Sequence, residues 1–490
     1  MSNRNETPTL LLSLLVTVIL LGGLGIWGWQ FLQKSLGTGN TGTSASNPSQ
    51  SSPGETASVP NTANGNQATA ANPSASRLST GEQSLIAENV STLKQLGVDA
   101  IAAGNSEQAV DLLEAAIRED RNDPEALIYL NNAQIGDAEA YTIAIAAPIA
   151  SALNPALEIL RGVAQAQTEI NEAGGMDGVL LRVVIADDGE TAETATQLAQ
   201  QFVEREDVLA VVGHFSSGTT IETAPIYTEG ELLLISPTST SVQISGMSDY
   251  VFRTAPSDRF AATSLARYML EDLQEQTVGI FFNSESSYST SLKDEFTTAV
   301  FSDGGQVLAE FDLMDASFDA EQAITQLQEQ DADVIMLAAN TATLDQALTV
   351  VAANNGELEL LGGDSLYNPQ VLEEGGEAAA AMVVAIPWHL LAHQNSSFVQ
   401  ASQTLWGGDV NWRTATAYDA VQAIAAALAT LPSPDRQSLQ QALSDTNFQA
   451  QGATNDVRFL PSGDRNQATQ LVIVQSGERS GFGYDFVPVN

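Results

Sequence analysis

A repeated alternation of short apolar runs and helical patterns, beginning at Tyr141, most constrains what this chain can fold into. Apolar runs of about four to eight residues bounded by turn signals are typical of buried parallel strands. The predicted strands are 141–146, 180–186, 208–212 and 231–235 in a first series and 277–282, 306–311, 333–338 and 358–361 in a second. Helical patterns separate them. Two successive β-α series predict an α/β fold of two doubly wound lobes.

The domain boundaries follow from where this alternation starts and stops. A long predicted helix over 413–430 and short strands near 455–459 and 469–474 complete the pattern. The two-lobed domain is therefore predicted to cover 139–478, followed by a C-terminal tail. Its predicted parts are lobe 1 at about 139–256 and 386–455, lobe 2 at about 257–385 and 456–478, and the tail at 479–490.

The first 80 residues predict a membrane tether. Residues 10–29 are apolar or small throughout, and twenty helical residues span roughly 30 Å, the thickness of a bilayer core. A secretory signal has a shorter apolar core of about 7–15 residues, and here tryptophans and Lys34 follow in place of a cleavage site. We expect residues 1–36 to be an uncleaved transmembrane anchor rather than a cleaved signal. Residues 37–80 lack the apolar surface that ordering requires and predict a disordered linker.

Residues 81–136 are helical by pattern and resemble a tetratricopeptide repeat followed by the first helix of the next. The residues that carry the resemblance are Leu96, Gly97, Ala100, Gly104, Ala109, Leu113 and Ala116. Gly104-Asn105 is the predicted tight turn, while Arg121 occupies the usual proline position, a departure from the pattern. Such repeats normally need about three neighbours to be stable. The segment is either a helical spacer packed on the next domain or a surface for docking a partner.

Composition excludes several function classes. A formal net charge of −42 argues against nucleic-acid binding and against a polybasic membrane patch. The absence of cysteine excludes disulfides, thiolate metal sites, a cysteine nucleophile and a lipid-modified N-terminal cysteine.

Two clusters of hydroxyl side chains follow neighbouring predicted strands. One is Gly213–Thr220, after the strand at 208–212, and the other is Ile235–Ser241. Open α/β sheets bind ligands just past the carboxyl ends of their strands. The helix predicted after Ser217 would also present free N–H groups to an anionic group such as a carboxylate.

These residues suit the binding of a zwitterionic amino acid. Ser217, Thr238 and Thr240 supply donors for an α-carboxylate, and Ser216 is a further ligand-binding candidate beside them. Asp364, after an apolar run of the second series, supplies an acceptor for an α-ammonium. Taken singly, each hydroxyl could equally be a helix cap or a loop bond, and Asp364 a turn residue.

An enzyme needs an assembled catalytic set, and the sequence offers little of one. Gly213 to Ser217 has the wrong spacing for a nucleophile elbow, although His214 stands near Ser216 in sequence. His389 and His393 are spaced to share a helical face, but Leu390 replaces the glutamate of a metalloprotease motif. We expect no catalytic residues, metal or cofactor.

From about residue 140 to 475 the chain resembles the type I periplasmic binding proteins of branched-chain amino acid uptake systems. The resemblance rests on the order and spacing of several motifs. They are Ile170–Gly175, Ala186-Asp187-Asp188, Val212–Ser217, Ile226-Tyr227, Ile235–Thr240, Phe252-Arg253-Thr254 and Ala417-Tyr418-Asp419-Ala420.

The resemblance implies roles at matching positions. Ser217, Thr238 and Thr240 would hold the ligand carboxylate, and Asp364 would meet the ammonium in place of the usual glutamate. Tyr288 matches an aromatic residue that lines the cleft. Asn340 stands where several relatives have a ligand-facing tyrosine, which favours a neutral or polar amino acid or a small amide over an aliphatic one.

The family implies an extracytoplasmic solute-binding protein of a bacterial ABC importer, with membrane permease subunits as partners. Two other hypotheses stay open. The domain could be a sensory module read by a partner through the helical repeat, or an amidase-like enzyme dependent on Ser217.

Overall fold

The computed structural model describes residues 77–88 and 90–489. No helix within these ranges combines the length and the apolar character needed to cross a bilayer. The predicted anchor at 1–36, and the predicted linker at 37–80 apart from its last four residues, lie outside the described residues. The structure therefore bears on the two lobes and on the helical segment that precedes them.

The first sheet has six strands in the order β1-β3-β2-β4-β5-β6. The strands are β1 (Leu78–Ser79), β2 (Ala140–Ala147), β3 (Leu180–Asp187), β4 (Val208–Val212), β5 (Leu233–Ser236) and β6 (Val251–Arg253). All neighbours are parallel except β1, which runs antiparallel to β3. Successive side chains point to opposite faces, so Ile143 and Ala144 enter different clusters, and both are buried. Burial on both faces explains the continuous apolar runs.

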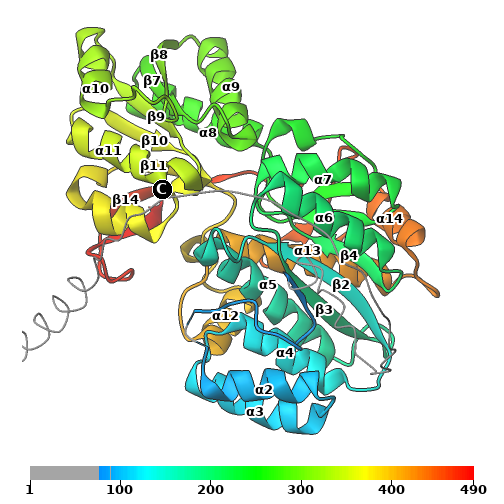
Figure 1. Cartoon of the computed structure of the whole chain (residues 1–490). Helices are drawn as coiled ribbons and strands as arrows, with labels where there is room; N and C mark the ends of the chain where they lie inside the picture. The colour runs from blue at the N-terminus through cyan, green and yellow to red at the C-terminus, as the bar shows by residue number, and fades with distance from the viewer. Residues whose placement is uncertain (1–76, 89, 490) are drawn as a thin grey trace, which may run out of the picture. The chain divides into compact units, whose positions relative to one another are not determined.

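Helices cover both faces of the first sheet (Figure 1). Those on the face of Ala144 are α6 (Ala192–Glu204) and α7 (Ser217–Glu229). Those on the face of Ile143 include α5 (Leu153–Glu172) and α13 (Trp412–Leu428), and α12 (Ser397–Trp406) and α14 (Arg436–Ser444) complete the lobe. A Cβ on Gly162 of α5 would lie 2.2 Å from the carbonyl oxygen of Thr414, so only glycine lets α5 and α13 approach this closely.

The second sheet has seven strands in the order β15-β14-β11-β10-β9-β7-β8. The strands are β7 (Thr277–Phe282), β8 (Gln306–Asp312), β9 (Val334–Ala338), β10 (Glu359–Gly362), β11 (Val383–Ile386), β14 (Gln470–Ser476) and β15 (Tyr484–Pro488). The five strands β7, β8, β9, β10 and β11 pair in parallel, whereas β14 and β15 are antiparallel to their neighbours. The covering helices are α8 (Asp258–Arg267) and α9 (Ser287–Ser302) on one face and α10 (Ala320–Glu329) and α11 (Leu344–Asn354) on the other.

Both sheets have a topological switch point. The first strand of each series, β2 or β7, lies between the second and the third, so consecutive connections leave it in opposite directions. In such sheets the crevice beyond the carboxyl ends of the strands is the usual ligand site. The predicted α/β fold of two doubly wound lobes is therefore confirmed.

Three stretches of chain connect the two lobes: between β6 and α8, between β11 and α12, and between Arg465 and β14. Arg465 forms a 3.1 Å ion pair with Asp419 of α13. Asp464 forms a buried 2.6 Å ion pair with Arg253 of β6. These pairs place residues 464 and 465 against the first lobe, which corrects the prediction that the second lobe resumes at 456.

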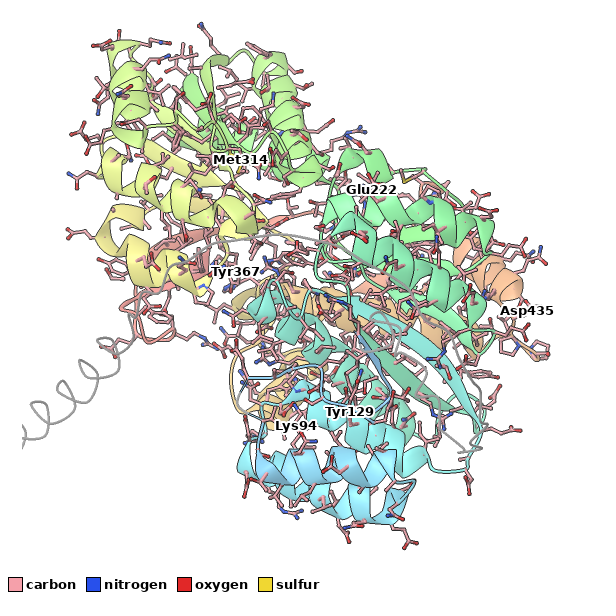
Figure 2. All side chains as sticks on the ribbon, viewed as in Figure 1. Lys94, Tyr129, Glu222, Met314, Tyr367 and Asp435 are labelled. Atoms are coloured by element: carbon pink, nitrogen blue, oxygen red, sulfur yellow. The ribbon has the colours of Figure 1, made fainter. Side chains whose placement is uncertain are left out.

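A segment of three helices precedes the first sheet. The helices are α2 (Thr92–Ala102), α3 (Ser106–Glu119) and α4 (Pro124–Ile135), and the predicted turn at Gly104 joins the first two with a φ of +76°. Lys94 of α2 is buried and lies 2.7 Å from the Glu125 carboxylate, which also accepts a 3.0 Å bond from the Tyr129 hydroxyl. Figure 2 labels Lys94 and Tyr129 in these helices.

Buried hydrogen bonds dock this helical segment on the first lobe. The Asn132 amide nitrogen donates to the Val183 carbonyl of β3 at 2.7 Å, and its oxygen accepts from Gln167 of α5 at 2.9 Å. Because a buried amide left unpaired is costly, these bonds fix the orientation of α4 on the lobe. Whether the segment acts as a repeat for docking a partner stays a prediction.

The two ends of the domain differ from prediction. Residues 479–490 were expected to form a tail, but Tyr484–Pro488 is strand β15, which pairs with β14. The disordered linker was expected to extend to residue 80, but Leu78–Ser79 is strand β1. Arg77 anchors that end through a 2.6 Å ion pair with Asp187 of β3. Composition alone predicts that this short segment is disordered, but pairing with the edge of a sheet orders it.

Candidate functional site

A cavity lies where the carboxyl ends of strands from both sheets meet. Its lining residues are Glu190, Phe215, Ser216, Ser217, Thr238, Trp412 and Arg413 from the first lobe and Ser286, Tyr288, Asn340, Thr341, Asp364 and Ser365 from the second. The space open to a water-sized sphere is ≈ 50 Å³. That is room for a few water molecules, so a larger ligand requires the lobes to move apart. Of the predicted site residues, all but Thr240 line this cavity.

Ser217 ties together the two hydroxyl-rich loops of the first lobe. Its Oγ accepts hydrogen bonds from the backbone N–H groups of Thr240 and Ser241, both at 3.2 Å. Since the oxygen acts as an acceptor in both bonds, its own proton is left to donate into the cavity. Ser217 can therefore serve as a neutral donor to a ligand carboxylate.

Ser216 and Thr238 use their hydroxyls mainly within the loops. The Ser216 Oγ caps α7 by accepting from the Thr219 N–H at 3.3 Å. The Thr238 hydroxyl donates to the Phe215 carbonyl at 2.7 Å, so in this conformation its proton is not directed at a ligand. Both residues shape the cavity wall, and the free N–H groups at the start of α7 lie beside them.

Thr240 lies beneath the cavity wall rather than in it. Its side chain is buried, 3% exposed, and does not line the cavity. Its carbonyl accepts from the Asp258 N–H at 2.8 Å. Burial raises the pKa of the Asp258 carboxyl to about 6, and the hydroxyls of Ser291 and Thr240 partly oppose that rise. Thr240 therefore belongs to the junction between β6 and α8.

Asp364 is the buried carboxyl of the second lobe, 8% exposed in the short helix after β10. Burial raises its pKa to about 7, Arg413 opposes the rise, and Asp258 adds to it. The Tyr288 hydroxyl stabilises the ionised form. A Cβ at Gly363 would lie 2.3 Å from that hydroxyl oxygen, so glycine is required for Tyr288 to reach this position.

Asn340 follows β9 and is held by its own loop. Its side-chain oxygen accepts from the Asn283 amide at 3.0 Å and from the Thr343 hydroxyl at 2.9 Å. With its oxygen satisfied, its amide N–H groups remain for the cavity. Asn340 therefore offers donors where a tyrosine would offer an aromatic face.

Among the cavity residues that sequence reasoning did not identify, Glu190, Trp412 and Arg413 bear most on its chemistry. Glu190 has a positive φ of 51° and accepts a bond from the Ser151 hydroxyl at 3.2 Å. Burial, then the nearby Asp188 charge, raise its pKa to about 7. Arg413 is 5% exposed, and its guanidinium carbon lies 4.4 Å from the centre of the Trp412 ring. The sequence signal that could have identified Arg413 is a single arginine among uncharged residues in the first turn of α13.

The described residues near the cavity do not assemble a nucleophile and a base. His214 is fully buried, with Nδ1 2.8 Å from Asp188 Oδ2 and Nε2 3.0 Å from the Tyr227 hydroxyl. Its ring therefore bonds away from Ser216 and Ser217, and a Ser–His hydrolase does not fit this geometry.

A larger cavity of ≈ 330 Å³ contains none of the predicted site residues. Tyr367, labelled in Figure 2, lines it together with His389 and Arg479. Burial, then the Arg479 charge, lower the pKa of His389 to about 4. His389 and His393 flank the short helix Leu390–Ala392 instead of sharing a helical face, so the predicted helical pair was wrong.

The fold and the cavity define a class: a two-lobed protein that encloses a small ligand between the carboxyl ends of two parallel sheets. Residues 140–481 match the family model described as periplasmic binding protein. The chain belongs to this family, whose members are solute-binding proteins.

Known relatives agree with this placement. The chain is 23% identical over 331 residues to the leucine-, isoleucine-, valine-, threonine- and alanine-binding protein of Pseudomonas aeruginosa, covering 67% of this chain and 87% of that protein. It is 26% identical over 234 residues to the leucine-specific-binding protein of Salmonella typhimurium, spanning 46% of this chain but only 61% of that relative.

The structure of an ABC transporter substrate-binding protein from Desulfitobacterium hafniense in complex with leucine is also similar. Its TM-score is 0.61 at 25% identity, and the match covers 71% of this chain and all of that one.

Proposed function

We propose that this protein is an extracytoplasmic solute-binding protein that captures a small amino-acid-like ligand between its lobes and delivers it to an ABC importer. One observation carries the proposal: the Ser217 hydroxyl from one lobe and the buried Asp364 carboxyl from the other line the same cavity. A neutral donor facing a carboxylate is complementary to the two ends of a zwitterion. Relatives named for amino-acid binding and ABC transport support the proposal.

Binding from both lobes would couple ligand capture to closure. A ligand that contacts Ser217 and Asp364 together is bound more tightly when the lobes are closed, so it shifts the population toward that state. The permease subunits would read this closed form. Anchoring by residues 10–29 is part of the proposal, because it would keep the domain beside the permease after export.

A thermal-shift screen against the common amino acids tests the binding. A ligand at 100 times its Kd should add about 2.7 kcal/mol of stability. Ser217→Ala should weaken binding of every amino acid about tenfold or more, because a charge-assisted bond is lost. Gly408→Ala is the matched control, since nothing lies within 4 Å of a Cβ at that position. A full shift in both Ser217→Ala and Asp364→Asn would overturn the proposed site.

Acidification should weaken binding of any ligand with an ammonium group. The pKa of Asp364 is about 7, so below that pH the carboxyl takes up a proton that must leave before it can pair with the ligand. Affinity should fall about tenfold for each pH unit below 7. Co-purification with permease subunits, or instead with a receptor kinase, separates transport from the sensing alternative.

A further inference from the structure

Arg413 and Trp412 leave two buried donors unused at the wall of the cavity. The Nε–H of Arg413 and the Nε1–H of Trp412 have no hydrogen-bond partner among the described residues. Their residues are only 5% and 1% exposed, and both line the cavity. Buried donors are normally paired, and an unpaired one costs free energy, more so when it is charged. Two adjacent orphan donors at one wall indicate a missing acceptor.

The protein's own acceptors do not fill this role. Asp364 lines the same cavity and the Arg413 charge lowers its pKa, yet no ion pair within 4.0 Å joins the two side chains among the described residues. The guanidinium donates one hydrogen bond within the described residues, from Nη1 to the Tyr367 carbonyl at 3.5 Å. Stacking on the Trp412 ring holds the guanidinium in place. The positive charge is therefore fixed in the cavity wall with Asp364 and Glu158 close enough to act on it, but with no carboxylate in direct contact.

We propose that Arg413 and Trp412 bind an acceptor group at the end of the ligand's side chain, so that the cleft selects amino acids with a side-chain carboxylate. The inference rests on the proposed function, since Ser217 and Asp364 must first hold the α-carboxylate and the ammonium. A guanidinium binds a carboxylate through parallel N–H bonds, which a side-chain amide reproduces only in part. An aliphatic side chain would leave both donors buried and unpaired.

Two carboxyl groups of the wall could oppose an anionic side chain. Asp364 is assigned to the ligand ammonium, which leaves Glu190. Its carboxyl accepts the Ser151 hydroxyl, and its pKa of about 7 leaves much of it uncharged near neutral pH. In the protonated form it can donate to the same ligand carboxylate. Its presence is therefore compatible with an acidic ligand.

Calorimetric titration of the full chain with L-glutamate, L-aspartate, L-glutamine and L-leucine tests the inference. The wild type should bind the two acidic amino acids most tightly, glutamine less tightly, and leucine most weakly. Arg413→Met keeps an unbranched apolar side chain and removes the donors. Because Arg413 also lowers the pKa of Asp364, its removal affects the ammonium site for all four ligands alike. Titrations at pH 8.5 therefore compare ratios of affinity: in this variant the preference for glutamate over leucine should fall about 10- to 100-fold.

Two further variants guard against a merely structural effect. Trp412→Phe keeps an aromatic ring and removes Nε1–H, and should lower the affinity for the acidic ligands a few-fold. Arg259→Gln removes an arginine whose side chain is 70% exposed, and should change nothing.

Equal loss for leucine and glutamate in Arg413→Met would overturn the inference. If leucine binds in a way that depends on Ser217 and Asp364 but glutamate does not bind, this inference is wrong and the proposed function stands. If the wild type binds no amino acid, both the inference and the proposed function are wrong.

Discussion

Replacing Asp364 by asparagine should stabilise the fold while abolishing ligand binding. The carboxyl is buried, and its pKa rises from 3.8 to about 7 on folding. A folded-state pKa above the unfolded one means that the native state holds its proton more tightly. The stability that this proton supplies is fully present below pH 3.8 and is lost as pH rises through 7.

The size of the effect follows from the two pKa values. A difference of about three units corresponds to roughly 4 kcal/mol of lost stability at pH 8, where Asp364 is ionised in both states. At pH 5 the native carboxyl is already protonated, and the loss falls to under about 2 kcal/mol. Asparagine carries no charge at either pH, so Asp364→Asn should recover these amounts.

Urea denaturation of wild type and Asp364→Asn at pH 8 and pH 5, without ligand, measures the difference. The variant should be the more stable protein at both values, with the larger gain at pH 8. Asp315→Asn, at an exposed aspartate of the second lobe, is the control and should show no such gain. An Asp364→Asn variant that is less stable than wild type, or equally stabilised at both pH values, would refute the argument that burial of the charge dominates.

Three other substitutions test the packing of the lobes and of the helical segment. Gly162→Ala should lower the melting temperature, because its Cβ would stand 2.2 Å from the Thr414 carbonyl oxygen and overpacking costs about 1–3 kcal/mol; an unchanged melting temperature would contradict this. Arg253→Met should lower the free energy of unfolding, measured with urea, by about 3–5 kcal/mol, because it leaves the buried Asp464 without its ion-pair partner. Full retention of stability would show that the pair is dispensable. Glu125→Gln should speed hydrogen exchange in α2 and α4 by removing the buried charge that Lys94 pairs with, and exchange equal to wild type would argue against that pair.

Strands with long apolar runs could be predicted from the sequence almost to the residue. The strands at 208–212 and 277–282 coincide with β4 and β7, because burial on both faces forces an uninterrupted apolar run. Strands β1 and β15 were missed because they owe their order to pairing at a sheet edge. Strand β11 is an apolar run that was overlooked, although it lies at the predicted return from lobe 2 to lobe 1.

The site was predictable only where its residues directly follow strands. Ser217 and Asp364 come just after apolar runs, so the rule for carboxyl ends of strands places them at the crevice. Arg413 comes from the start of α13, which returns to the first lobe after the whole second lobe has been formed. Its approach to Asp364 depends on tertiary packing between segments that local patterns do not relate.

The three connections between the lobes restrict how the molecule can move. A single connection would allow one lobe both to bend and to twist relative to the other. Three connections resist twisting and leave bending about a common hinge axis as the main motion. Opening and closing should then follow nearly one coordinate. A pair of fluorophores, one on α3 and one on α10, would report that coordinate as a single distance, and the protein would serve as a reagentless optical sensor for its own ligand.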